Sequence, residues 1–456
     1  GGNLGWTQAG RIEYARNGGR INTDFIDNSA GVDTSDHEVN IKILLDAEVA
    51  AGRISEQERD ELLPAMADDV ASLVLRHNHS QNLALANALS SDGPTAGVLE
   101  AWMCELEESG HLDRAVDTMP STTEMNRRMA AGERLASPEL CTLLAWTKIA
   151  LCDAVLATDL PEDPFVADRL VGYFPPLLRE RFTERMPTHR LHREIITTEA
   201  VNRFVDSQGI TAYYRLHLQT GADIAQVIRC QLAARSVFGL GRVETDLTHL
   251  GLDAVRTAKI RLALTDLAMH ATRWFLNHGG ADDIAGTIET YRPGVATLVE
   301  KLSERLLGDS ADAWQEKVDE VTELGLDRSD AAVVAAYDWS PVLLSIVEIS
   351  EEGHPLDEVA DAYLTLARRV DMIRLTRLVE QLPQDRPTDA RVRASLREDL
   401  LRVMSDATRR AVVIGTDNVL ADGGRIVKSI AANPDLAHCV VMVSDLRSAV
   451  GQEVTL

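Results

Sequence analysis

The sequence of 456 residues predicts a mainly α-helical protein, an irregular multi-helix domain preceded by a short α/β remnant. Three observations carry this prediction. Helix-capping residues recur from Ser35 onward, and apolar residues follow them at helical spacing. The loops between these segments are short, which is typical of helices that pack against their sequence neighbours. The sequence has no strict repeat period, which disfavours a regular solenoid.

The first thirty residues contain the strand-like segment. Residues 20–26 lie between Gly18-Gly19 and Asp27-Asn28, a pattern typical of a short strand. Residues 7–16 are expected to form a helix that Thr7 caps. A helix followed by a strand is part of a βαβ unit, and its parallel partners are expected to lie upstream. The chain is therefore expected to open within an α/β domain.

The helical part is expected to begin at Ser35. Ser35 and Glu38 have the spacing of a capping box, and Ser55 is expected to cap the next helix. Gly52 should end the first helix, because a left-handed residue is least costly as glycine. Pro64 should kink or break the second helix.

Further helix starts are expected where a capping residue precedes an apolar run or a proline, at Ser121, Ser137-Pro138, Asp163-Pro164 and Thr188. The helix from Thr188 should end at Gly209. Helical patterns continue through residues 223–238, 252–277, 294–307, 311–323, 329–349, 355–382 and 388–411. Residues 411–445 are the least clear, and a helical continuation is favoured there over a strand.

Composition excludes several classes of protein. The formal net charge of −25 would repel a nucleic-acid backbone. No run of about 18 apolar residues exists to span a membrane, and no secretory signal pattern is found. The five cysteines form no C-x-x-C pair, which fits a reducing, cytoplasmic setting. With 4% aromatic residues, the core should consist mainly of Leu, Ala and Val.

Several motifs near the start carry a family resemblance. They are Gly2-Asn3-Leu4-Gly5, Arg11-Ile12-Glu13-Tyr14, Ile21-Asn22-Thr23-Asp24, Asp27-Asn28-Ser29-Ala30-Gly31-Val32 and Ser35-Asp36-His37-Glu38-Val39-Asn40. This segment resembles the end of the Rossmann-type catalytic domain of the large, NAD-specific glutamate dehydrogenases of bacteria. The similarity continues to about residue 280, for example at Trp146-Thr147-Lys148-Ile149 and Tyr173-Phe174-Pro175. It departs at Ala136-Ser137, where the family usually has Thr-Arg.

The resemblance implies a cofactor contact. Glutamate dehydrogenases place a Gly-x-Asn turn after a Rossmann strand, and Gly2-Asn3 looks like that turn. The resemblance implies that the Asn3 amide, together with Gly2 and Asn28, contacts NAD. An amide offers both a donor and an acceptor, which suits a carboxamide or a ribose. The alternative is a simple turn, since asparagine is common in turns.

The resemblance also implies a substrate contact. Residues 28–35 look like the family's Asn-x-Gly-Gly-Val-x-x-Ser stretch, with Ala30 in place of its first glycine. It implies that Gly31 and Val32 line the glutamate pocket and that Ser35 holds the distal carboxylate. A helix N-terminus carries a positive partial charge that suits a carboxylate. The alternative is that Ser35 only caps its helix.

Other polar residues are expected to be structural. The first helical turn carries a polar cluster of Asp33, Asp36, His37 and Glu38. Adjacent positions on a helix point in different directions, so these side chains cannot converge on one metal ion. We expect the cluster to be solvated. His189 and His192 lie three apart, without an H-E-x-x-H motif, and are expected at a domain contact or the surface.

The family's catalytic Lys and Asp and its Gly-rich pyrophosphate turn are not found in residues 1–456 and are expected upstream. No catalytic residue is therefore assigned to this chain.

The prediction divides the chain into the end of a catalytic domain (1–54) and two parts of a helical domain (55–280 and 281–456). The resemblance implies the C-terminal portion of an enzyme that converts L-glutamate, NAD and water to 2-oxoglutarate, ammonium and NADH. Its partners would be the rest of its own catalytic domain and further copies of itself. The chain alone is expected to be inactive. The alternatives are a non-catalytic oligomerisation or regulatory module and, least favoured, a free-standing enzyme of the helical part.

The helical part is expected to dock on the catalytic domain, because no Gly/Ser- or Pro-rich linker separates the two. Residues 189–196 are the predicted contact, since they are basic in an acidic chain and carry apolar side chains that need a partner surface.

Overall fold

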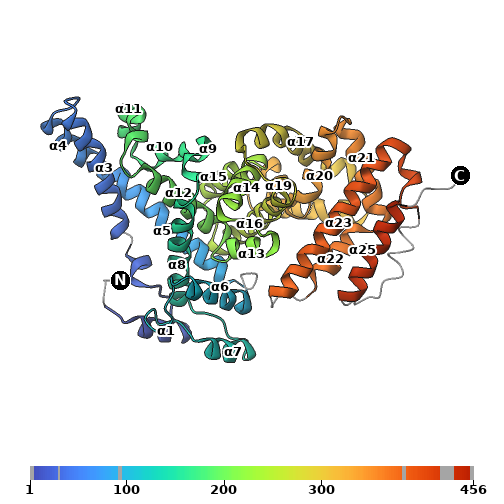
Figure 1. Cartoon of the computed structure of the whole chain (residues 1–456), viewed down its shortest axis with the longest axis horizontal. Helices are drawn as coiled ribbons and strands as arrows, with labels where there is room; N and C mark the ends of the chain where they lie inside the picture. The colour runs from blue at the N-terminus through green and yellow to red at the C-terminus, as the bar shows by residue number, and fades with distance from the viewer. Residues whose placement is uncertain (1–4, 29–30, 91–94, 383–386, 422–435, 452–456) are drawn as a thin grey trace. The chain divides into compact units, whose positions relative to one another are not determined.

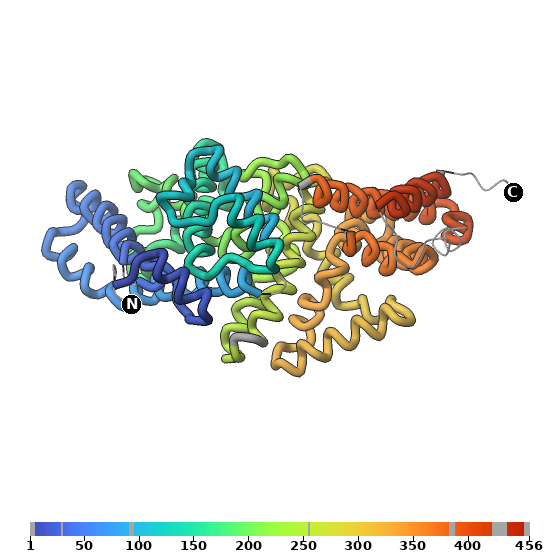
Figure 2. Tube along the Cα trace, turned by 90° about the horizontal axis from the view of Figure 1, so that it is seen from below, coloured from blue at the N-terminus to red at the C-terminus, as the bar shows by residue number. Residues whose placement is uncertain are grey.

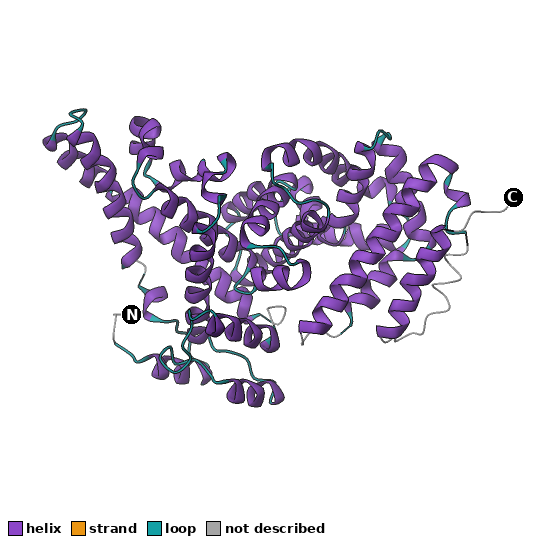
Figure 3. Cartoon of the chain, in the orientation of Figure 1, coloured by secondary structure: helices purple, strands orange, loops and turns teal. Residues whose placement is uncertain are grey.

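The computed structural model describes residues 5–28, 31–90, 95–382, 387–421 and 436–451. All regular structure in these ranges is helical, and Figure 3 shows no strand among them. The chain divides into two compact units. Unit 1 comprises residues 1–214 and 223–228, and unit 2 comprises residues 215–222 and 229–456. The prediction of a mainly α-helical, multi-helix protein is confirmed.

The strand predicted at residues 20–26 is wrong. Residues 20–23 are irregular, and Asp24–Asp27 form a short helix, so the described residues show no α/β remnant. A strand needs a neighbouring strand for its backbone groups. Here side chains take that place: Arg11 donates to the carbonyl of Asn22 at 2.8 Å, and Asn78 donates to the carbonyl of Ile26 at 2.6 Å.

Unit 1 is built from helices of very different length; those labelled η are 3-10 helices. They are α1 (Gln8–Arg16), α2 (Asp24–Asp27), α3 (Val32–Ala50), α4 (Glu56–Ala65), α5 (Ala67–Leu89), α6 (Ala96–Glu108), α7 (Thr122–Ala130), α8 (Ser137–Leu156), η1 (Leu160–Glu162), α9 (Pro164–Ala167), α10 (Arg169–Tyr173), α11 (Pro176–Phe182), η2 (Thr183–Thr188) and α12 (His192–Gln208). Helices α13 (Ala212–Thr220) and α14 (Ile224–Val237) carry residues of both units.

The core of unit 1 lies where α5, α8 and α12 meet. Their inner faces bury apolar side chains such as Leu85, Leu143 and Phe204. The buried indole of Trp102 donates to the hydroxyl of Thr147 at 2.7 Å, so its polar atom is satisfied. At the blue end of the trace (Figure 2), the chain reverses direction at α4, so that α5 returns alongside α3. The start of α3 therefore lies beside α5.

Most of the predicted helix starts are confirmed. Thr7, Ser55, Ser121 and Asp163 each accept a hydrogen bond from a backbone N–H in the first turn, at 2.9–3.3 Å. Two of the starts predicted at a cap before a proline or an apolar run are wrong. Ser137 is the first residue of α8 and not its cap, and α12 begins at His192, four residues after Thr188. A 3-10 helix takes up Thr188, while the end of α12 at Gly209 is confirmed by its positive φ of 96°.

Unit 2 contains the remaining helices. They are α15 (Leu240–His249), α16 (Ala254–Asn277), α17 (Ile284–Arg305), α18 (Asp309–Glu323), α19 (Arg328–Ala335), η3 (Ala336–Asp338), α20 (Ser340–Glu351), α21 (Leu356–Arg369), α22 (Met372–Glu380), α23 (Pro387–Ile414), η4 (Thr416–Asn418) and α25 (Leu436–Gly451). Helix α23 lies beside α21, α22 and α25 (Figure 1).

Helix α17 starts ten residues earlier than the apolar pattern predicts. The prediction places its start at residue 294, since a Pro-Gly pair such as Pro293-Gly294 usually marks a break in a helix. Both lie inside the helix. A Cβ at Gly294 would be 2.7 Å from Val347 of α20, so glycine lets the two helices approach closely. Helix α20 is almost wholly buried between its neighbours.

No single helix in the described ranges is long and apolar enough to cross a membrane. A pair bent by 92°, residues Arg328–Asp338 with Ser340–Glu351, reaches that length and composition only together.

Candidate functional site

Four predicted contact residues lie together at the start of α3. Asn28 follows α2, Gly31 is the N-cap of α3, Val32 is its first residue and Ser35 lies in its first turn. The N–H of Gly31 donates to the carbonyl of Asn28 at 3.2 Å. Val32 is 85% exposed, and Ser35 is also exposed. The other two predicted residues, Gly2 and Asn3, lie outside the described residues.

Glycine at position 31 has a local cause. A Cβ there would be 2.7 Å from Nδ2 of Asn28, closer than real Cβ contacts come. The missing side chain therefore lets the Asn28 amide lie directly against the start of α3. The structure brings together one predicted cofactor residue and the predicted substrate residues.

The expected capping box of Ser35 is wrong. Helix α3 begins at Val32, three residues before Ser35, whose N–H already donates to the carbonyl of Gly31 at 3.4 Å. Glu38 pairs with Lys42 one turn further on, at 2.5 Å. The interpretation of Ser35 as the helix cap is thereby removed.

The segment before α3 is held by buried polar contacts. Arg11 of α1 is 2% exposed and forms an ion pair with Asp24 in addition to its bond to Asn22. Asn78 of α5 fixes the other side through Ile26. These contacts set where α3 begins relative to α1 and α5.

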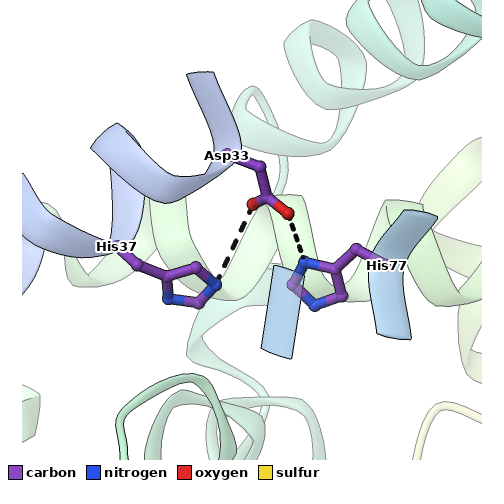
Figure 4. A group of neighbouring side chains, drawn as sticks. All are labelled: Asp33, His37 and His77. Carbon is purple, nitrogen blue, oxygen red and sulfur yellow. Dashed lines mark hydrogen bonds and ion pairs between the residues drawn. The ribbon is translucent and has the colours of Figure 1, made fainter. Parts of the chain in front are cut away.

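A partly buried cluster of ionisable side chains, Asp33, His37 and His77, lies at the start of α3 (Figure 4). His37 is fully buried, and its ring stacks on Tyr173 with centroids 4.4 Å apart and on His77 at 5.6 Å. Nδ1 of His77 lies 3.0 Å from Oδ2 of Asp33, and Nε2 of His37 lies 3.9 Å from Oδ1 of the same carboxylate. Nε2 of His77 lies 3.8 Å from Glu199.

The surroundings of the two histidines shift their pKa values in opposite directions. The hydrogen bond to Asp33 raises the pKa of His77, whereas burial lowers the pKa of His37. Both ring nitrogens of His37 are buried without a hydrogen-bond partner in the described part of the chain, which fits a neutral ring. The hydrogen bond to Asp33 thus favours the protonated form of His77, and burial favours the neutral form of His37.

A second set of contacts ties α3 to α10 and to His189, which directly follows η2. The Tyr173 hydroxyl donates to Oδ2 of Asp36 at 2.8 Å and accepts from Nδ2 of Asn40 at 2.8 Å. His189 donates from Nε2 to the carbonyl of Asn40 at 3.1 Å.

In the segment 189–196, His189 is buried and contacts α3, and the docking of this segment on the catalytic domain stays a prediction. Arg193 binds the carbonyl of Leu156 at 2.9 Å instead, and Ile195 and Ile196 are buried within unit 1.

The expectation of a solvated first turn is wrong for His37, which is buried, and is confirmed for Asp36 and Glu38, which are exposed. Asp33 is half-buried, and both Asp33 and Asp36 also bind side chains, from α5 and α10 respectively. Their partners His77 and Tyr173 lie 44 and 137 residues away, so the sequence pattern gave no reason to connect them. The i, i+4 spacing of Asp33 and His37 was the available signal, because it places both on one helical face.

Asp33, His37 and His77 could also hold a metal ion. One possible ligand atom from each of these residues lies within 4.8 Å of the other two. All three residues belong to the part of the chain that the structure describes. A structural zinc site takes four ligands, so one more would be needed. The expectation that no metal binds here stays a prediction.

The Asp33–His77 pair predicts a pH dependence of stability. The pKa of His77 is raised above its unfolded value of 6.5, so the pair's contribution is full below that value and is lost as pH rises through the folded pKa. Asp33→Asn should therefore reduce the free energy of unfolding more at pH 6 than at pH 8.5, measured by urea unfolding. In a His77→Gln background, the loss should be equal at both pH values. Equal losses with His77 present would contradict a charged His77.

Comparison with known proteins identifies relatives. A family model described as "Glutamate dehydrogenase, C-terminal" matches residues 132–453, and one described as "Bacterial NAD-glutamate dehydrogenase, catalytic domain" matches residues 1–88. The chain is 35% identical over 468 residues to an NAD-specific glutamate dehydrogenase of Pseudomonas aeruginosa. The matched region covers 100% of this chain and 28% of that relative. Proteins with the same description from Mycobacterium tuberculosis and Halomonas elongata are 36% and 35% identical over 91% of the chain and 26% of their own length. The chain thus spans about a quarter of these relatives.

Proposed function

The chain belongs to the bacterial NAD-dependent glutamate dehydrogenase family, and from this premise we propose that the full-length protein oxidises L-glutamate. The products are 2-oxoglutarate, ammonium and NADH. This chain supplies one wall of the active-site cleft, at the start of α3, and a long helical region. The observation that carries the proposal is the gathering of Asn28, Gly31, Val32 and Ser35 at that helix start.

The substrate role follows from the exposed first turn of α3. The N-terminus of a helix attracts anions, because its first N–H groups lack intrahelical acceptors. The Ser35 hydroxyl would donate to the distal carboxylate of glutamate, and Val32 would line the pocket for its methylene groups. Gly31, the N-cap of α3, would lie beside the bound substrate. The contacts of Asp33 with His77 and of Asp36 with Tyr173 would position this turn by tying it to α5 and α10.

The residues near Gly31 fit an NAD contact. The glycine leaves room for the Asn28 amide, which offers both a donor and an acceptor. Asn28 would hold the nicotinamide end of the dinucleotide together with Gly2 and Asn3. NAD, when bound, takes up the hydride that leaves glutamate. The chain by itself is expected to form no NADH, since it contains no Gly-rich pyrophosphate turn.

Ser35→Ala in the full-length enzyme tests the substrate role. Losing one hydrogen bond to a charged group costs about 1.5–3 kcal/mol, or roughly tenfold to over a hundredfold in affinity for glutamate. The affinity for NAD and the melting temperature should stay the same, because Ser35 is not the cap of α3.

Ser55→Ala is the matched control for Ser35→Ala. Ser55 caps α4, so its loss should cost about 1 kcal/mol of stability and leave the affinity for glutamate unchanged. Unchanged affinity in the Ser35 variant would contradict the proposed contact.

The composition of unit 2 favours a role for this unit other than catalysis. Residues 229–456 contain none of the six predicted substrate or cofactor residues, and the described part of them is helical. A non-catalytic role in assembly or regulation therefore suits this unit, while residues 1–54 complete the catalytic domain. Assembly into a homo-oligomer would be one form of that role.

A further inference from the structure

Unit 2 contains a pocket with buried arginines. Its volume is about 630 Å³, within the range of small-molecule sites. Arg273 of α16 and Arg397 of α23 both line it, and Trp339 and Leu400 add apolar surface. We call it the α16–α23 pocket. Its basic lining is notable in a chain with a net charge of −25.

The positive charges of these two guanidinium groups have few hydrogen-bond or ion-pair partners among the described residues. Arg273 is 8% exposed, and its Nη1 donates to the neutral amide of Gln219 at 3.1 Å. Nε of Arg397 is buried without a hydrogen-bond partner among the described residues. A buried donor without a partner is unfavourable, and more so when it is charged.

Other arginines make the local field more positive. Burial lowers the pKa of Arg273 first, and the charges of Arg397, Arg215 and Arg393 lower it further, against a weaker opposing effect of Glu398. The pKa of Arg397 falls to about 10 for the same reasons, burial first and then Arg393. A guanidinium keeps its proton in a protein, so a counter-anion is the way to relieve this field.

The nearby carboxylates are engaged or weakened. Glu398 accepts a hydrogen bond from Asn277 at 2.9 Å. Glu380 is exposed to solvent. Asp338, which lines the pocket, has its pKa raised to about 6 by burial, so its charged form is weakened but still predominates near neutral pH. Among the residues that line the pocket, six are Arg or Lys and four are Asp or Glu, so the lining carries an excess of positive charge.

We propose that the α16–α23 pocket binds a small organic dianion, whose carboxylate or phosphate oxygens accept hydrogen bonds from Arg273 and Arg397. The planar guanidinium matches both oxyanions through paired N–H donors. The apolar surface of Trp339 and Leu400 suits the carbon skeleton of such a ligand. The pocket lies entirely within unit 2, so this proposal does not depend on the proposed dehydrogenase activity.

Calorimetric titration of the 456-residue chain with succinate and with phenyl phosphate tests the proposal, with sodium chloride at equal ionic strength as the control for screening. We expect saturable binding of at least one dianion and no comparable signal from chloride. Succinate alone would indicate a dicarboxylate, and phenyl phosphate alone a phosphate ester. No saturable binding of either probe would overturn the proposal.

Arg397→Met and Arg391→Met form a matched pair of variants on α23. Arg397 lines the pocket, whereas Arg391 is exposed on the same helix. Arg397→Met should weaken dianion binding by about tenfold or more, while Arg391→Met should leave it within about twofold. Without a dianion, Arg397→Met should melt no lower than the parent chain, because like-charge repulsion is relieved.

A lower melting temperature of Arg397→Met with unchanged dianion affinity would assign Arg397 a structural role and overturn the proposal. If Arg397→Met does not fold, Arg397→Lys is titrated in its place. Lysine keeps the charge but loses the paired donors, so it should still weaken binding. Undiminished binding by that variant would also contradict the proposed contact.

Discussion

Arg128→Met is expected to lower the free energy of unfolding by about 3 kcal/mol. Arg128 of α7 is 5% exposed, and its Nη1 donates to both carboxylate oxygens of Glu139, which is 1% exposed, at 2.8 and 3.0 Å. Removing one partner of a buried pair leaves an uncompensated charge, at a cost of about 3–5 kcal/mol. The lower end applies because Glu139 still accepts from the N–H of Ala136 at 2.7 Å.

Arg127→Met is the matched control for this prediction. Arg127 is the preceding residue, its side chain is 55% exposed, and it pairs with Glu124 at 2.8 Å. An exposed ion pair contributes about 0–1 kcal/mol, so this variant should unfold almost as the parent does. Urea unfolding of both variants measures the difference. Similar small losses would show that the Arg128–Glu139 pair contributes no more than a surface pair.

His37→Ala should lower the free energy of unfolding by about 2–4 kcal/mol, because it opens a cavity in a fully buried site. The ring packs between Tyr173 and His77, and its nitrogens lack hydrogen-bond partners among the described residues. The cost is therefore expected to come from packing. His37→Phe should recover most of the loss, since it restores an aromatic ring without polar nitrogens.

The control for His37→Ala is His79→Ala. His79 is exposed on α5, and surface substitutions usually stay within about 0.5 kcal/mol. Chemical unfolding of the three variants separates packing from other contributions. If His37→Phe were as unstable as His37→Ala, the imidazole itself would be required and the packing explanation would be wrong.

Local chemistry made most of the helices predictable from the sequence. Thr7, Ser55 and Asp163 could be assigned as caps because a capping side chain accepts a hydrogen bond from a backbone N–H only two or three residues away. The family could also be inferred from contiguous motifs such as Ser35–Asn40. The four described residues predicted to contact ligands lie within eight positions of one another, so their proximity needed no tertiary information.

Long-range contacts decided what the local pattern could not. Residues 20–26 have the composition of a strand, but Arg11 and Asn78 take their carbonyl groups, so no strand forms. Ser35 has the spacing of a cap, yet the helix begins at Val32, after a segment that these same contacts anchor.

The sequence by itself thus determined the helical class, most helix ends and the family, since caps, glycines and motifs act over a few residues. Only the tertiary structure decided that His37 is buried between His77 and Tyr173, and that Arg273 and Arg397 line one pocket. Burial and charge interactions depend on distance in space, and residues far apart in the chain become neighbours only when the helices pack.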